Sequence, residues 1–400
     1  MQIGLGVSTD KNIAFAAQEA VKLAKSELKN APDLAIVFSS TDMASSILLK
    51  TISAILSDIP IIGASASVLF ANQEILEHGV AILLVDFPDG VHFNTAFAKG
   101  VNGRSTLAAE EIGEGLLYGF KDIPRILSVV LSDGLTAEST NFIAGLQERL
   151  GRSFPLTGAS ASDHPLLKSQ LFFNKETYSD ACVGLLIGGK INFGLGIKHG
   201  WNPLGKPHIA TKTNDNLLIE IDGQPTVEFY QEYLGCDLKR LKKDLNRISI
   251  FYPIGVYIPG EKEYLLRNIV SLQPDGAMRF QGNIPEKSTI RIMIGTKETC
   301  LDATRQAAEE AMNSLLSKPS KENKNEIGKK FALVFSSISR HELLRRDVKK
   351  ELEAIKQVLG DDTPILGIYT HGELAPLKAI SYRGQVYFHN QSIAILIIGG

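Results

Sequence analysis

The sequence predicts an α/β protein with mixed β-sheets flanked by helices, built from three similar βαβαββ-like units and an inserted β-rich module. Short apolar runs of strand length alternate with longer stretches in which apolar residues recur at every third or fourth position, as is typical of α/β proteins. The string Gly-Ala-Ser-Ala-Ser occurs at both 63–67 and 158–162, in equivalent places of two such frameworks. An identical string inside a matching framework indicates an internal repeat.

The first unit covers about residues 1–90. A helix is expected over 12–28, where apolar residues recur at helical spacing and Pro32 follows as a stop signal. The run 34–40 is apolar and ends in two hydroxyl residues, which indicates a buried strand that leads into a polar loop. The other elements expected here are strands over 3–7, 59–65 and 80–87 and a helix over 42–56.

The second and third units repeat this order. In the second unit, about 91–200, strands are expected over 92–98, 126–133, 154–160 and 181–187, and helices over 107–118 and 141–150. In the third unit, about 289–400, strands are expected over 290–294, 331–337, 364–370 and 393–398, and helices over 301–316 and 341–359. Thr299 is the expected N-cap of the first of these helices, and the charged stretch 317–330 is an expected solvated loop.

The segment between the second and third units, about 206–288, does not repeat. Turn signals rich in Gly, Pro and Asp separate strands expected over 216–221, 249–256 and 264–270 and a helix over 226–233. The first two units therefore form a predicted N-terminal domain, residues 1–205. The inserted module and the third unit form a predicted C-terminal domain, residues 206–400.

The charge balance argues against a nucleic-acid-binding protein. The chain carries 42 basic and 44 acidic side chains, whereas proteins that neutralise phosphates concentrate basic groups. The N-terminus lacks a signal-peptide pattern, and no apolar run approaches the ~20 residues that span a bilayer. Cys182, Cys236 and Cys300 are far apart, which fits buried thiols in a reducing compartment. We therefore expect a cytoplasmic protein that does not insert into a membrane.

Several motifs that would indicate a cofactor or a metal are incomplete. The run 184–190 has the glycine–lysine spacing of a P-loop, but Ile191 replaces the required hydroxyl residue. The run 4–9 lacks the third glycine of a dinucleotide fingerprint, and His341-Glu342 has no second histidine at the required spacing. The sequence therefore predicts no cofactor and no metal.

Chemistry-bearing side chains gather at the strand ends of the third unit, where ligands bind in α/β sheets. They are Arg340, Tyr369, Thr370, His371, Glu373, His389 and Asn390. Arg340 could hold a carboxylate and Glu373 an ammonium, so the pair would suit an amino-acid zwitterion. Alternatively, the two side chains could pair with each other.

Two further interpretations stay open from the residues alone. The chain could be an enzyme acting on a carboxylate-bearing metabolite, with Glu373 or His371 as acid–base group and Arg340 as anion clamp. Ser65, Ser160 and Asp163 could line equivalent ligand sites in the first two units, or they could cap turns and helix starts.

The order of short motifs along nearly the whole chain resembles the FIST family (F-box and intracellular signal transduction proteins). The most specific match is Gly372-Glu373 followed by His389-Asn390. The other matches count through their order along the chain, among them Gly63-Ala64-Ser65 in the first unit and Trp201-Asn202-Pro203-Leu204-Gly205 at the domain junction. The chain departs from the family pattern at Ser337 and Ser339, where a cysteine and a glycine are expected, and at Ser392, where a threonine is usual.

The resemblance implies FIST N-terminal and C-terminal domains and a sensory module for signal transduction. It also implies a small-molecule ligand, with amino acids as the proposed class. Relatives are often fused to output domains, so the resemblance further implies that any signal from this chain passes through a separate partner protein.

Overall fold

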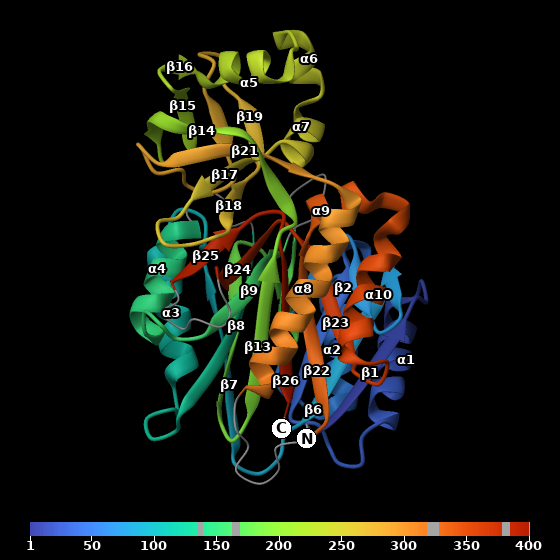
Figure 1. Cartoon of the computed structure of the whole chain (residues 1–400). Helices are drawn as coiled ribbons and strands as arrows, with labels where there is room; N and C mark the ends of the chain where they lie inside the picture. Colours follow the sequence, from blue (N-terminus) through green and yellow to red (C-terminus); the bar gives the residue numbers. More distant parts are fainter. Residues whose placement is uncertain (134–138, 162–168, 318–327, 378–384, 400) are drawn as a thin grey trace.

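The computed structural model describes residues 1–133, 139–161, 169–317, 328–377 and 385–399. It confirms the α/β class with mixed and antiparallel sheets. Three sheets of six strands form the body of the molecule, and a smaller module with its own sheet sits at one end (Figure 1). Both chain termini lie at the opposite end of the body (Figure 1).

The first unit follows the predicted order. Its elements are β1 (Gln2–Ser8), α1 (Ile13–Ser26), β2 (Leu34–Ser40), the 3₁₀ turn η1 (Thr41–Met43), α2 (Ser46–Leu56), β3 (Ile61–Ala66), β4 (Leu69–Ala71), β5 (Glu74–Leu76) and β6 (Val80–Asp86). Asn12 begins α1 by accepting hydrogen bonds from the N–H groups of Ala14 and Phe15. β2 and β3 are parallel, and β6 and β1 continue the sheet in antiparallel fashion.

The second unit repeats this topology with β7 (Val91–Lys99), α3 (Ser105–Leu117), β8 (Arg125–Asp133), α4 (Ser139–Leu150), β9 (Leu156–Ala161), β10 (Leu171–Phe173), β11 (Glu176–Tyr178) and β12 (Ala181–Gly189). β8 and β9 are the parallel pair, and β12 and β7 continue the sheet. The short hairpin β10–β11, like β4–β5 in the first unit, has no counterpart among the predicted elements.

The third unit begins earlier than the sequence predicted. Its first strand is β13 (Asn192–Lys198), which pairs with the last strand, β26 (Ile393–Gly399). The other elements are α8 (Lys297–Leu316), β22 (Lys330–Ser337), α9 (Ile338–Leu344), η2 (Arg345–Asp347), α10 (Val348–Leu359), β23 (Ile365–Thr370), β24 (Gly372–Pro376) and β25 (Val386–His389). The module is therefore inserted after the first strand of this unit, and the expected first strand, 290–294, belongs to the module instead.

Two helix expectations in the third unit also change. α8 begins at Lys297, because Thr296 is its N-cap and Thr299 completes a capping box with it. The expected single helix over 341–359 is two helices, since Arg345 has a positive φ of 51° that ends α9. Most of the expected loop 317–330 lies outside the described residues.

The hairpin of each unit extends the sheet of another unit. β10–β11 of the second unit extends the sheet of the first, β4–β5 of the first extends that of the third, and β24–β25 of the third extends that of the second. Each exchanged hairpin covers the open edge of a parallel pair, where unpaired backbone groups would otherwise remain. The exchange links all three sheets into one body.

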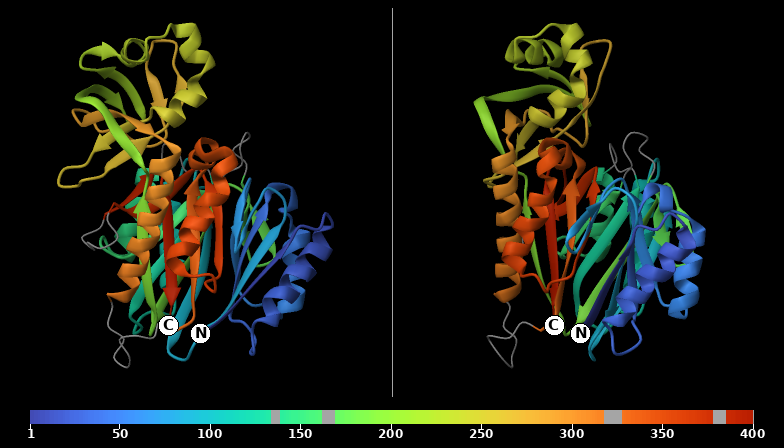
Figure 2. Two further views of the ribbon diagram at one scale, coloured as in Figure 1. Left: turned by 45° about the vertical axis from the view of Figure 1, so that its right-hand side comes forward. Right: turned by 90° about the vertical axis from the view of Figure 1, so that its right-hand side faces the viewer.

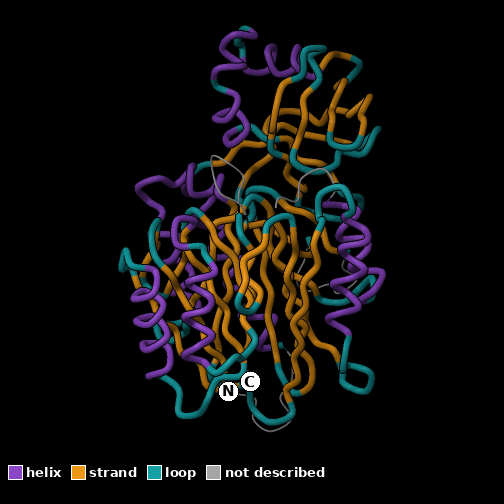
Figure 3. Tube along the Cα trace, turned by 180° about the vertical axis from the view of Figure 1, so that it is seen from behind, coloured by secondary structure: helices purple, strands orange, loops and turns teal. Residues whose placement is uncertain are grey.

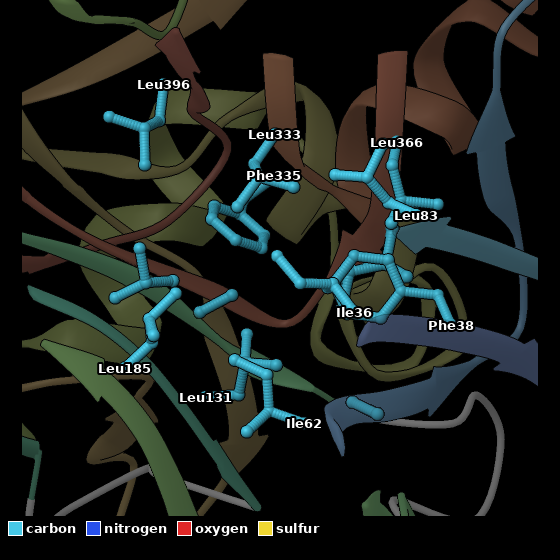
Figure 4. Packing of buried hydrophobic residues seen from close by; sticks show 14 of the residues in the cluster. Ile36, Phe38, Ile62, Leu83, Leu131, Leu185, Leu333, Phe335, Leu366 and Leu396 are labelled. Atoms are coloured by element: carbon cyan, nitrogen blue, oxygen red, sulfur yellow. The ribbon is translucent and has the colours of Figure 1, made fainter. Parts of the chain in front are cut away.

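The inner faces of the three sheets meet in a shared apolar core. Ile36, Phe38, Leu131, Leu333 and Phe335 come from three different units and pack together there (Figure 4). The helices lie on the outside of the body, around the central strands (Figures 2 and 3). Alternate residues of each strand therefore face either the central core or a helix layer.

The module contains β14 (Trp201–Asn214), β15 (Leu217–Ile221), β16 (Gln224–Pro225), α5 (Thr226–Leu234), α6 (Leu238–Lys243), α7 (Leu245–Phe251), β17 (Ile254–Tyr257), β18 (Tyr264–Arg267), β19 (Ile269–Leu272), β20 (Met278–Phe280) and β21 (Thr289–Gly295). The expected strand over 249–256 is instead the end of α7 followed by β17, with Pro253 between them. The expected strand over 264–270 is interrupted at Asn268, which separates β18 from β19.

Candidate ligand-binding site

Three polar residues hold the same register position at the ends of β2, β8 and β22. They are Ser40, Asp133 and Ser337. The residue two positions before each of them belongs to the central core, so alternation places all three side chains on that same inner face. The third unit differs from the other two in how this side chain is hydrogen-bonded.

In the first two units this side chain is satisfied locally. Ser40 Oγ accepts a hydrogen bond of 3.0 Å from the N–H of Gly79, the residue before β6. Asp133 accepts the equivalent bond of 2.6 Å from the N–H of Asp180, the residue before β12, and another of 2.6 Å from Ser169. Burial raises the pKa of the Asp133 carboxyl, and these hydrogen bonds oppose that shift.

In the third unit the equivalent backbone N–H group donates to a different acceptor. Ser392, the residue before β26, donates its N–H to Glu373 Oε2 at 3.2 Å. Ser337 Oγ is therefore left with no hydrogen-bond partner among the described residues, although Ser337 is only 1% exposed. Buried hydroxyl groups in folded proteins are nearly always hydrogen-bonded, so this one requires an explanation.

Glu373 causes this difference, because it occupies a position that is apolar in the other two hairpins. Its register partner is Ala159, and the equivalent positions on β4 and β10 are Leu69 and Leu171, both in the central core. Complete burial raises the pKa of Glu373 to about 8. The carboxyl group is therefore mostly protonated at neutral pH.

The hydrogen bonds around Thr370 agree with a protonated Glu373. Thr370 Oγ1 lies 2.6 Å from Glu373 Oε1 and 3.2 Å from the backbone oxygen of Ser336. A hydroxyl group has one hydrogen to donate. Both contacts are satisfied when Thr370 donates to the Ser336 oxygen and the Glu373 carboxyl group donates to Thr370.

Arg340 is placed differently from the expected zwitterion clamp. Its guanidinium group is fully buried and forms an ion pair of 2.8 Å with Glu351 of α10. It also donates to the backbone oxygens of His199 and Cys300, at 2.7 and 2.8 Å, and to the Thr304 hydroxyl. The alternative pairing with Glu373 is wrong, because Glu351 is the acidic partner.

Tyr369 belongs to the same buried network, which faces the helix layer. Its hydroxyl donates to Glu351 Oε2 at 2.5 Å, and its ring stacks on Phe70 at 4.5 Å between centroids. Glu351 was not singled out by the sequence, because it lies within a charged helix whose other acidic side chains are mostly exposed. Its place on the inner side of α10, beside the apolar Leu352 and Ile355, was the available signal.

The orphaned Ser337 lies in a pocket of about 170 Å³ between the module and the third unit. The lining residues are Asn246, Ser249, Ile250, Asn268, Ile269, Val270, Gln281, Ser337, Ile338, Ser339, Glu342 and His371. Ser249, Ser337 and Ser339 are buried, whereas Asn246, Val270 and Glu342 are exposed. The pocket therefore has a buried polar floor and an exposed rim.

A chain of amide hydrogen bonds fixes the orientation of the Asn268 side chain. Gln281 Nε2 donates to the backbone oxygen of His371, which can only accept. Gln281 Oε1 therefore accepts from Asn268 Nδ2 at 3.5 Å, and the same Nδ2 donates to Ser339 Oγ at 3.3 Å. Asn268 Oδ1 then remains buried without a partner among the described residues.

Asn390 ties the body to the module beside this pocket, and His389 precedes it at the end of β25. Asn390 Oδ1 accepts a hydrogen bond of 3.2 Å from the backbone N–H of Asn268. Burial lowers the pKa of His389 to about 3, so its neutral ring donates from Nε2 to the Ala375 oxygen at 3.0 Å. Of the residues predicted in the third unit, His371 alone lines the pocket, and the others form its immediate support or the Arg340 network.

The serine positions predicted in the first two units lie elsewhere. Ser65 and Ser160 hold the register position of Tyr369 and face the helix layers of their own units. Ser65 Oγ accepts a hydrogen bond of 3.0 Å from the Gln170 N–H. The backbone oxygen of Ser160 accepts one of 3.1 Å from the His371 N–H. Asp163 lies outside the described residues.

Within the described residues, no group of three or more His, Cys, Asp or Glu side chains is placed to hold a metal ion. No helix in that part of the chain is both long and apolar enough to cross a membrane.

Solved structures offer only distant likenesses. Cyanuric acid hydrolase from A. caulinodans aligns over 99% of this chain and 98% of its own, with a TM-score of 0.39 and 8% identity. A T. maritima PurL structure, complexed with FGAR, aligns with a TM-score of 0.23 and 10% identity over 99% of this chain and 72% of its own. Likenesses of this size carry no argument about fold or function.

Sequence relatives and family profiles match far more specifically. An uncharacterized protein of Mycobacterium tuberculosis is 24% identical over 387 residues, which cover 94% of this chain and 95% of the relative. An uncharacterized protein of Mycobacterium bovis is 23% identical over 410 residues, which cover 99% of both chains. The FIST N domain matches residues 33–224 and the FIST C domain matches residues 226–376. The chain therefore belongs to the FIST family.

Proposed function

We propose that this protein is a sensory component of signal transduction that binds a small ligand in the pocket between the module and the third unit. FIST domains are in general sensory domains of signal transduction. The observation that carries the ligand site is Ser337 Oγ, a buried hydroxyl that lines the pocket without a partner among the described residues. A bound ligand would supply the missing hydrogen bond.

The position of the pocket supports a sensory role. Ser249, Asn268 and Gln281 come from the module, whereas Ser337 and Ser339 come from the third unit. A ligand that contacts both sides stabilises their contact, because it binds the assembled junction better than a separated one. A separate partner protein that recognises this junction would then receive the signal.

Acid–base catalysis remains the alternative function. A carboxyl group with a pKa near 8, such as that of Glu373, suits proton transfer at neutral pH. Glu373 is however fully buried and does not line the pocket, and Arg340 is held by Glu351 rather than presented as an anion clamp. Binding therefore has the better structural support.

The first test is thermal unfolding of the full chain against a broad panel of small metabolites. A ligand at about a hundred times its Kd stabilises by about 2.7 kcal/mol, which for a chain of this length shifts Tm by about 3 °C. Ser337→Ala should weaken binding roughly tenfold, because one hydrogen bond is lost. The same variant should unfold at the wild-type Tm or slightly above it, since it removes a buried unpaired hydroxyl.

Ser132→Ala is the matched control. Ser132 Oγ is also buried without a partner among the described residues, but Ser132 is not part of this pocket. The control should keep the full ligand-induced shift. A panel in which nothing stabilises the wild type, or a ligand whose shift survives Ser337→Ala unchanged, would count against the proposed site.

A further inference from the structure

We infer that the pocket between the module and the third unit selects ligands with a small hydrogen-bond-donor head, a primary amide or a primary amine, and rejects carboxylates. This inference rests on the proposed ligand site and specifies its chemistry. It departs from the amino-acid zwitterion expected from the sequence, since a zwitterion needs a cation in the site for its carboxylate.

The unpaired oxygen atoms of the pocket residues favour a ligand that donates hydrogen bonds. Asn268 Oδ1 is an acceptor whose orientation is fixed through Gln281 by the backbone oxygen of His371. Ser337 Oγ, at the pocket floor, has no partner among the described residues and can accept a hydrogen bond from a ligand as well as donate one. An N–H₂ group carries two hydrogens and can serve both oxygens, whereas a carboxylate has none to give.

The charges at the pocket also favour a hydrogen-bond donor over a carboxylate. Its lining contains no lysine or arginine, and its one carboxylate, that of Glu342, stands at the exposed rim without an ion-pair partner among the described residues. The cation closest in sequence on α9, Arg340, is neutralised by Glu351. A carboxylate that entered would lose water without gaining a lysine or arginine partner from the lining, and that transfer is unfavourable.

The size and walls of the pocket limit the rest of the ligand. A cavity of about 150 Å³ accommodates benzene, so a pocket of about 170 Å³ takes a ligand of roughly six to eight heavy atoms. Ile250, Ile269 and Ile338 form an apolar part of the wall. The preferred ligand therefore combines the donor head with a short aliphatic tail.

Three small probes of nearly equal shape separate these chemistries: isobutyramide, isobutylamine and isobutyrate. Their binding to the full chain is measured by ligand-observed NMR titration to millimolar concentration. We expect isobutyramide or isobutylamine to bind and isobutyrate to bind at least tenfold more weakly. Ser337→Ala should weaken whichever donor binds, and Ser132→Ala should leave it unchanged.

Glu342→Gln distinguishes a cationic head from a neutral one. The substitution keeps the shape of an exposed side chain and removes the only carboxylate of the lining. A severalfold loss for isobutylamine, with isobutyramide unaffected, identifies an ammonium site. If the probe that binds has the same affinity for the variant as for the wild type, the site recognises a neutral amide. Either result supports the donor-head inference.

Three outcomes overturn the inference, and together they separate it from the proposed function. Isobutyrate binding as tightly as isobutyramide, with sensitivity to Ser337→Ala, would keep the ligand site and refute its selectivity. In the second outcome, neither donor probe binds while the metabolite panel yields a ligand of another class whose binding depends on Ser337. That result would also keep the ligand site and refute its selectivity. Binding of the donors with no effect of Ser337→Ala would refute the site itself.

Discussion

Glu373 shows how one residue can change the chemistry of a repeated framework. The equivalent hairpin positions are leucines in the central core, and the carboxyl group here accepts the N–H that satisfies Ser40 or Asp133 in the other units. The result is an unpaired hydroxyl on Ser337, at the floor of a pocket. A carboxyl group inside the core thus leaves an open hydrogen-bonding position at the buried floor of the pocket.

The raised pKa of Glu373 makes the stability of the protein depend on pH. Below about pH 4.5 the group is protonated in both states, and above that the unfolded chain releases a proton that the folded chain keeps up to about pH 8. The free energy of unfolding should therefore fall by up to about 5 kcal/mol across this window. Glu373→Gln, whose neutral amide keeps both hydrogen bonds, should remove that part of the pH dependence.

The measurement is urea unfolding at about pH 5 and about pH 8.5, where Glu373→Gln should gain on the wild type only at the higher pH. Glu309→Gln, an exposed carboxylate on α8, is the control and should follow the wild type at both pH values. Parallel pH profiles for Glu373→Gln and the wild type would show that Glu373 is already ionised in the folded protein.

At the scale of elements, the exchanged hairpins carry interactions that their own units do not use. β4 belongs to the first unit by sequence, but it pairs with β23 of the third and places Phe70 against Tyr369. Phe70 is fully buried among residues of α8, β22 and β26. The first unit therefore supplies part of the wall behind the Arg340–Glu351 network.

Phe70→Ala should destabilise the protein by about 3–5 kcal/mol, because it opens a cavity between two units. Phe15 on α1 is 61% exposed, and Phe15→Ala is expected to change stability by no more than about 0.5 kcal/mol. Both free energies come from urea unfolding. Similar small effects for the two variants would mean that β4 does not pack into the third unit in solution.

At the scale of the whole molecule, the three sheets depend on one another. The N-terminal domain predicted from the sequence, residues 1–205, lacks β24–β25, which complete the sheet of the second unit. It also contains β13, whose partner strand β26 ends the chain. The inner faces of the first two sheets would lose the core residues contributed by the third.

A fragment of residues 1–205 expressed alone should therefore associate and unfold without a cooperative transition, because it exposes strand edges and apolar core. Co-expression with residues 206–400 should restore a stable complex that purifies with both pieces. Size-exclusion chromatography and thermal unfolding provide the readout. A monomeric 1–205 fragment that melts cooperatively near the Tm of the full chain would establish it as an independent domain instead.

The sequence by itself determined most of the body: the repeat, the apolar strands and the helices such as α1 and α4, because periodicity within a short window reports which face of an element is buried. It also placed polar groups such as Thr370, His371 and Asn390 near one region of the third unit. It did not predict α6, α7 or the three-residue strands, since segments this short contain too few residues to establish a period.

Only the tertiary structure decided the partners of the important groups. Arg340 pairs with Glu351 rather than Glu373, because α10 packs against α8 and places the Glu351 carboxylate beside Arg340 and Ser336. Packing between elements is not encoded in local spacing. The hairpins join neighbouring sheets, because an open strand edge accepts any strand of fitting register. Ser337 lacks a partner because Glu373, distant in sequence, takes the hydrogen bond that it would otherwise receive.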